Sequence, residues 1–124
     1  MKTHFFVGLM IILLATCSLQ EPAHAESGLE GQVFVGPQCP VVQVGQACPD
    51  QPYQATLTVN NLAGERIAQV QTDAQGRFKI PLASGDYILH PESPNVYPFA
   101  PDQAFSVQEG RFTQLTITYD SGIR

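Results

Sequence analysis

Apolar and polar residues alternate in several short stretches of the chain, which is the pattern of half-buried β-strands. In residues 77–82, Phe78, Ile80 and Leu82 take every second position, with charged residues and a proline between them. Residues 112–119 repeat the same period of two. Beyond the apolar N-terminal run, no stretch has the 3.6-residue period of an amphipathic helix, so the pattern predicts an all-β domain.

Seven such stretches follow one another, separated by turn residues and by two longer segments. The predicted strands are residues 29–35, 54–60, 66–72, 77–82, 86–90, 103–107 and 112–119. Short strands at this spacing predict a seven-stranded β-sandwich of two sheets with Greek-key connections. The apolar positions that we expect in its core include Leu29, Val33, Val35, Leu57, Val59, Ala68, Val70, Phe105, Val107, Leu115, Ile117 and Tyr119.

Two tight turns frame the fourth strand. The first is Asp73-Ala-Gln-Gly76, in which Gly76 can take the positive φ that a three-residue hairpin loop with a bulge requires. The second is Ala83-Ser-Gly85-Asp86. We therefore expect a hairpin between the third and fourth predicted strands.

Two proline-rich segments are too long to be turns. Residues 36–53 contain four prolines and form a predicted loop, and a loop longer than about 12–15 residues is usually functional or disordered. Residues 91–101 also contain four prolines, which lack a backbone N–H and cannot all lie in a strand ladder. We expect this second segment to be an extended connector.

Three short motifs resemble the carboxypeptidase regulatory-like domain, a branch of the transthyretin-like, or prealbumin-like, sandwiches. They are Gly31-Gln-Val33, Thr72-Asp-Ala-Gln-Gly-Arg-Phe78 and Ser84-Gly-Asp-Tyr87, and the likeness covers residues 28–119. The resemblance implies a seven-stranded sandwich that acts as a binding, spacer or stabilising module. The motif residues Asp73, Gly76, Phe78, Gly85 and Tyr87 belong to turns and core, so the likeness speaks to fold rather than to chemistry.

The N-terminus predicts export. A short positive start, an apolar run of residues 5–19 and the small-residue site Ala23-His-Ala25 match a secretory signal peptide, residues 1–25, and the run is short for a membrane span. The mature domain would then be residues 26–124, in the periplasm or outside the cell. Alternatively, Leu14-Ala-Thr-Cys17 resembles the bacterial lipobox, in which Cys17 would be lipidated and anchor the domain to a membrane.

Charge and cysteine content narrow the function further. The chain has 6 basic and 11 acidic side chains, a net charge of −5, and removal of residues 1–25 leaves this net unchanged. An acidic domain with scattered basic residues lacks the basic patch that nucleic-acid binding requires. The even pair Cys39 and Cys48 in an exported chain predicts a disulfide rather than a redox or zinc site, worth about 2–3 kcal/mol by the loop-entropy argument.

The sequence offers no catalytic set. His90 is the sole histidine after residue 25, without a cysteine or serine beside it, and Asp73 and Asp86 occupy turn positions where aspartate binds backbone amides. Asp50, Asp102 and Asp120 are dispersed, whereas a calcium site needs oxygens that converge from one loop. We therefore expect neither an enzyme, nor a metal site, nor a cofactor.

Two surfaces are candidates for binding. Tyr97 and Phe99 on the connector could stack on a sugar or on a partner, or else close the end of the core; Tyr53 is a third candidate ring. The cysteine loop carries Val41, Val42 and Val44, as an apolar patch or as a small satellite core. The sequence thus predicts a small exported, non-enzymatic β-sandwich that binds a protein or glycan partner or serves a structural role, with a carbohydrate-binding module as the alternative. Its oligomeric state stays open.

Overall fold

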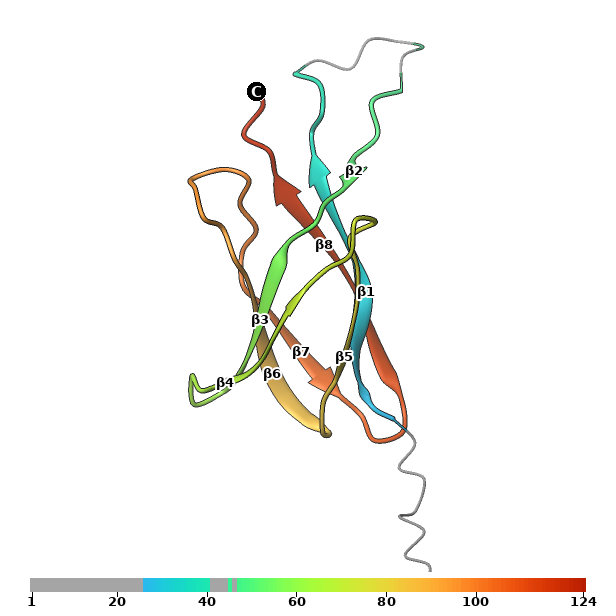
Figure 1. Ribbon diagram of the computed structural model, residues 1–124, viewed down its shortest axis with the longest axis vertical. Coiled ribbons are helices and arrows are strands. Elements are labelled where there is room, and N and C mark those ends of the chain that lie inside the picture. Colours follow the sequence, from blue (N-terminus) through green and yellow to red (C-terminus); the bar gives the residue numbers. More distant parts are fainter. Residues whose placement is uncertain (1–25, 41–44, 46) are drawn as a thin grey trace, which may run out of the picture.

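The computed structural model describes residues 26–40, 45 and 47–124 (Figure 1). Its eight strands are β1 Gly28–Gly36, β2 Gln51–Pro52, β3 Thr56–Asn61, β4 Arg66–Gln71, β5 Arg77–Pro81, β6 Gly85–Pro91, β7 Gln103–Val107 and β8 Phe112–Asp120. In these residues there is no helix of the length and apolarity that a membrane crossing needs. The predicted signal peptide, the lipidation candidate Cys17 and the loop residues Val41, Val42 and Val44 lie outside the described residues.

The strands form two four-stranded sheets that pack as a sandwich. In the first, β1 is central, with β2 and β5 antiparallel along one edge and β8 along the other. β1 and β8 run parallel over their whole length, from Gly28 opposite Phe112 to Gly36 opposite Asp120. The second sheet has the order β4-β3-β6-β7, all antiparallel. The predicted all-β sandwich is confirmed, and the first and last long strands of the described chain are neighbours.

The core lies between the two sheets and follows the period-two pattern of the sequence. Phe78, Ile80 and Leu82 are buried, as predicted, and so are most of the other predicted core residues, whereas Val35, Ala68, Val70 and Leu115 are only half-buried. The buried apolar residues are Leu29, Val33, Ala55, Leu57, Val59, Phe78, Ile80, Leu82, Tyr87, Leu89, Ala100, Phe105, Val107, Ile117 and Tyr119. Half-buried Val35, Tyr53, Ala68, Val70 and Leu115 pack against this cluster.

The turn of residues 73–76 is held by bonds within it and by two bonds from β1, in which the Val33 N–H donates to the Gly76 carbonyl and the Gln32 amide donates to the Gln75 carbonyl, both at 2.8 Å. The Gly76 N–H donates to the Asp73 carbonyl at 2.9 Å, and Asp73 Oδ1 accepts from the N–H groups of Gln75 and Arg77. Gly76 has the predicted positive φ, 74°. A side chain there would also collide with the backbone of Val33, so glycine is required twice over.

The pairing around this turn corrects the prediction. β4 and β5 do not form a hairpin: β4 pairs with β3 in one sheet and β5 with β1 in the other, so the turn carries the chain between sheets. The hairpin prediction was wrong because turn residues alone do not specify which strands pair.

Two smaller corrections concern prolines. Pro52 lies in β2, a short strand within the predicted loop 36–53, and Pro91 still pairs with Leu57, so the connector begins at residue 92.

The sandwich has two unlike ends (Figure 1). At one end, here called the turn pole, lie the turns of residues 61–65, 82–85 and 108–111, and β1 begins beside them, where the Gly28 N–H donates to the Arg111 carbonyl. At the other, the connector pole, the segment that follows β1, the connector 92–101 and the C-terminal residues 120–124 come together. This second end holds the connector and the described residues at the start of the cysteine loop.

Candidate binding surface at the connector pole

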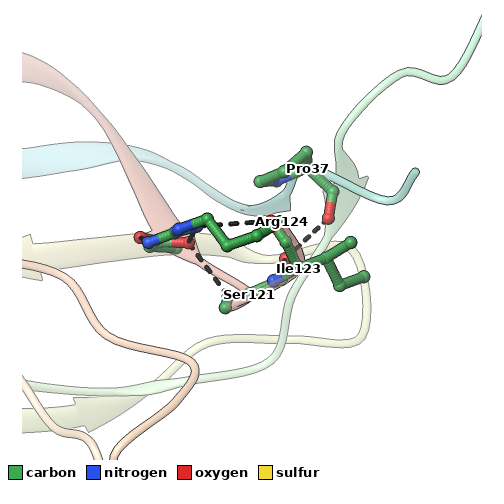
Figure 2. Close-up of polar contacts among 6 residues, drawn as sticks. Pro37, Ser121, Ile123 and Arg124 are labelled. Carbon is green, nitrogen blue, oxygen red and sulfur yellow. Dashed lines mark hydrogen bonds and ion pairs between the residues drawn. The ribbon is translucent and has the colours of Figure 1, made fainter. Parts of the chain in front are cut away.

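The C-terminal residues extend the pairing of β1 and β8 beyond the sheet. The Ser121 N–H donates to the Gly36 carbonyl at 2.8 Å, and the Ser121 hydroxyl donates to the Pro37 carbonyl at 2.6 Å (Figure 2). The Ile123 N–H in turn donates to the Ser121 hydroxyl at 3.2 Å. The segment after β1 is thereby fastened to the end of the chain.

The connector is fastened to β8 at two points. Phe99 and Asp120 exchange two backbone hydrogen bonds, of 3.0 and 2.6 Å. At the other end of the connector, the hydroxyl of the buried Tyr119 donates to the Glu92 carbonyl at 2.9 Å. Burial raises the pKa of the Tyr119 phenol above its ordinary value, so it remains a protonated donor at neutral pH.

Tyr97 lies against the C-terminal residues. Its ring is so near Gly122 that a Cβ at that position would come within 2.7 Å of it. The Arg124 guanidinium lies 5.9 Å from the ring centroid, within the range of a cation–π contact, and is 2.9 Å from the Asp120 carboxylate. The hydrogen bond from Arg124, with that from the Gly122 N–H, lowers the pKa of Asp120 to about 2.

The connector nonetheless exposes an apolar strip. Val96 is 79% exposed, Tyr97 46% and Phe99 50%, so the two rings do not close the end of the core as fully buried side chains would. Tyr53 is placed apart from them: its N–H donates to the Val33 carbonyl and its half-buried ring meets that of Tyr119, with centroids 4.9 Å apart. The three candidate rings therefore do not form one platform.

The cysteine loop closes on itself next to this surface. Cys39 and Cys48 form the disulfide that the sequence predicts, with their Cα atoms 6.2 Å apart. The Gln38 amide donates to the Val35 carbonyl at 2.7 Å. The Asp50 side chain lies against Gly36, and β2 after it pairs with Phe34 and Val35 of β1. Both arms of the loop are thus tied to the end of β1.

The candidate acid–base residues are engaged in structural contacts. His90 Nδ1 is 2.6 Å from Asp102 Oδ1, and its Nε2 is 3.6 Å from Glu92 Oε2, so both ring nitrogens face carboxylates. The hydrogen bond to Asp102 raises the pKa of His90. The Asp86 carboxylate accepts from the Ser106 hydroxyl at 2.6 Å. In the described part of the chain, no three His, Cys, Asp or Glu side chains are grouped as metal ligands.

Sequence reasoning missed one side-chain network on the outer face of the second sheet. The Gln69 amide donates to Thr58 Oγ1 at 3.1 Å, and the Thr58 hydroxyl donates to Glu92 Oε1 at 2.7 Å. Through Glu92 the chain of contacts continues to His90 and Asp102. The one hint in the sequence is period two: Thr58 and His90 both occupy outward positions of predicted strands.

Comparisons with known proteins bear on the fold. The TIE protein of Bacillus anthracis is 23% identical to the chain, with a TM-score of 0.54. GBS52, the minor pilin of Streptococcus agalactiae, is 15% identical with a TM-score of 0.56, and the shaft pilin SpaA from Lactobacillus rhamnosus GG is 11% identical with a TM-score of 0.58. Each alignment covers 77% of this chain.

These proteins are larger than the chain, which matches 17%, 45% and 51% of their respective lengths. At such identities the likeness establishes a shared sandwich fold. No family model matches the chain, and no curated protein does. The fold agrees with a prealbumin-like sandwich, and membership of the carboxypeptidase regulatory-like family stays a prediction.

Proposed function

We propose that the chain is a non-enzymatic structural module of an exported protein, and that it presents its connector pole to a partner. One observation carries the proposal. Three segments far apart in sequence, the start of the cysteine loop, the connector and the C-terminal residues, meet at the end of the sandwich opposite the start of β1 (Figure 1). A surface built in this way faces away from whatever holds the N-terminal side.

The frame beneath this surface suits a structural role. β1 and β8 are paired through nine consecutive positions, and Ser121 adds two further bonds. A pull between the N-terminal side of β1 and the C-terminal side of β8 loads all these parallel pairs together instead of one at a time. The ladder therefore resists separation of its two ends.

The candidate acid–base side chains already have hydrogen-bond or ion-pair partners within the protein, which supports a non-enzymatic role. A general base needs a free ring nitrogen or carboxylate within reach of its substrate. His90 has a carboxylate at each nitrogen, Asp73 binds the amides of its own turn, and Asp86 accepts from Ser106. Each of these groups stabilises the fold locally.

Export to the periplasm or the cell exterior accords with three features. The apolar run and cleavage site of residues 1–25 match a signal peptide, and a structural disulfide persists in oxidising compartments. Two structural neighbours are described as pilins. If Cys17 were lipidated instead, residues 18–27 would tether the turn pole to a membrane and the connector pole would face outward.

A carbohydrate-binding module is the alternative function, and the exposure of two rings favours it. Tyr97 and Phe99 are each about half exposed, as stacking platforms must be. However, Gly122 and Arg124 already occupy the surroundings of the Tyr97 ring. Binding on a glycan array that disappears in a Phe99→Ala variant would support this alternative, and an array without signal would remove it.

Site-specific photo-crosslinking tests the main proposal. A photoreactive phenylalanine replaces Val96 at the connector pole or, as a matched control, Leu62 at the turn pole, two apolar positions that are 79% and 66% exposed. In the native host, we expect a discrete cross-linked protein from position 96 and none from position 62. Cross-linking from position 62 alone, or none from position 96, would contradict the proposal.

A further inference from the structure

A groove of about 410 Å³ opens on the side of the sandwich where the connector begins after β6, beside the start of β3. This volume falls within the range of small-molecule sites, about 300–1,000 Å³. Its lining residues are Tyr53, Gln54, Ala55, Thr56, Gln69, Glu92, Ser93 and Pro94. Among these residues Glu92 alone carries a charge, so the groove is a polar site with one negative group.

Glu92 is held in place from three directions. Its N–H donates to the Thr56 carbonyl at 2.9 Å, its carbonyl accepts from the Tyr119 hydroxyl at 2.9 Å, and its Oε1 accepts from the Thr58 hydroxyl at 2.7 Å. The side chain is still 39% exposed. A carboxylate that is fixed before binding and open to solvent loses little conformational entropy when a ligand arrives.

Two glutamines of the lining use their amide nitrogens for hydrogen bonds within the protein. The Gln54 amide nitrogen donates to the Thr72 carbonyl and the Gln69 amide nitrogen donates to Thr58 Oγ1, both at 3.1 Å. The amide oxygens of Gln54 and Gln69 have no hydrogen-bond partner among the described residues. The lining also holds the Tyr53 side chain and the Ser93 hydroxyl, which is buried without a hydrogen-bond partner among the described residues and can accept as well as donate, so most of its polar groups are acceptors.

We propose that this groove binds a primary alkylammonium group, carried either by a lysine side chain of a partner or by a free diamine. An ammonium has three donors and no acceptor, which matches a groove lined by one carboxylate and two glutamine amides, and aromatic rings attract cations. The net charge of −5 favours the approach of a cation. His90 Nε2, 3.6 Å from Glu92 Oε2, competes for the carboxylate when protonated, so binding is stronger with neutral His90.

A titration of the isotope-labelled exported protein with n-butylammonium, followed by amide NMR shifts at about pH 8, tests the site. We expect saturable shifts at Gln54, Thr56 and Gln69, with a Kd of about 1–10 mM. Glu92→Gln keeps an acceptor for Thr58 but removes the charge, and should weaken binding at least tenfold. Glu109→Gln, in the turn before β8, changes the net charge equally and should leave the affinity as it was.

Further probes distinguish the two sources of the ammonium. Tighter binding of Nα-acetyl-lysine methylamide than of n-butylammonium indicates a lysine of a protein partner, and tighter binding of putrescine indicates a free diamine. Equal affinities show that the ammonium alone is recognised. All three results support the site. Neutral n-butanol shifting the same amides with equal affinity would overturn it. So would unchanged affinity in Glu92→Gln, or no shifts up to tens of millimolar probe.

Discussion

The turn of residues 73–76 and the connector of residues 92–101 both link strands, yet the share of local hydrogen bonds differs between them. Within the turn, the backbone and carboxylate of Asp73 accept three hydrogen bonds from residues no more than four positions away, and β1 adds two bonds to the turn's carbonyls. The connector is held by Tyr119 and Asp120, which follow it in sequence by about twenty residues or more. Its conformation therefore depends on the fold being complete.

This difference separates the frame from the surface that it presents. Short turns with local bonds form with their strands and leave little backbone free for a partner. A long segment anchored by distant bonds keeps side chains such as Val96, Tyr97 and Phe99 exposed between its anchor points. Substitutions that alter the turn and spare the connector, or the reverse, test this difference between the frame and the exposed surface.

Replacing Gly76 should have the largest effect on stability. In Gly76→Ala, the positive φ of 74° and the collision with the Val33 backbone act together, and we expect the free energy of unfolding to fall by roughly 2–4 kcal/mol. Gly64→Ala is the control, because Gly64 has a similar φ of 85° but open space around it, and should cost about 1 kcal/mol. Equal losses in urea denaturation would show that the close packing of the turn is unimportant.

Removal of the disulfide should come next. Cys39→Ser with Cys48→Ser frees a loop whose two cysteines are nine positions apart, which lowers stability by about 2–3 kcal/mol through the entropy of the unfolded chain. We expect a lower Tm, with hydrogen exchange faster in residues 36–50 and unchanged in the 73–76 turn. Loss of all cooperative unfolding would mean that the loop supports the whole sandwich.

Two tyrosine hydroxyls provide a matched pair. Tyr119→Phe removes the bond to the Glu92 carbonyl and Tyr87→Phe removes a 2.7 Å bond to the Ala83 carbonyl, each worth about 1 kcal/mol. The stability losses should be similar, but only Tyr119→Phe should speed hydrogen exchange across the connector. If the connector is unaffected, its anchor is not the tyrosine.

The C-terminal contact should respond to acid. Because Arg124 and the Gly122 N–H lower the pKa of Asp120 from 3.8 to about 2, this contribution is present above about pH 4 and is lost as the pH falls through 2. We expect the Gly122 amide resonance to titrate in that window, and Asp120→Asn to abolish the change. A midpoint near 4 would show that the ion pair does not form in solution.

His90 should give the smallest effect, with the opposite sign. Asp102 raises its pKa, so its contribution to stability is complete below the ordinary value of 6.5 and is lost as the pH rises through the folded value. NMR titration of the imidazole should show the raised pKa, and Asp102→Asn should lower it. An unshifted pKa of His90 in the unmodified protein would show that the contact with Asp102 does not form in solution.

The sandwich frame could be predicted from the sequence because its signals lie in adjacent residues. Most contacts of the connector pole could not be predicted, because they join residues that are far apart in the sequence. Period two located the buried Phe78, Ile80 and Leu82, and the need for positive φ identified Gly76, because both signals lie in adjacent residues. Pairing between residues far apart carries no such signal. Ser121 and Pro37 are 84 positions apart, and nothing in either residue indicates the other.

The same limit applies to strand assignment and to the alkylammonium groove. Turn residues predicted that the chain reverses after Thr72, but whether β5 joins β4 or β1 is decided by packing of the whole domain. Glu92 stands between prolines in sequence, and its role follows from Thr58 and Tyr119, which reach it from other strands. Side-chain networks of this kind depend on register, which hydrophobic pattern specifies only along one face.

Amide hydrogen exchange by NMR tests most directly whether the β1–β8 ladder is a rigid frame beneath a connector that is held only by a few distant bonds. We predict that the amides of β8 that donate to β1 exchange only through global unfolding, with the full unfolding free energy of about 5–15 kcal/mol, while those of residues 92–101 exchange through smaller openings. Exchange of the β8 amides as fast as that of the connector would contradict the account.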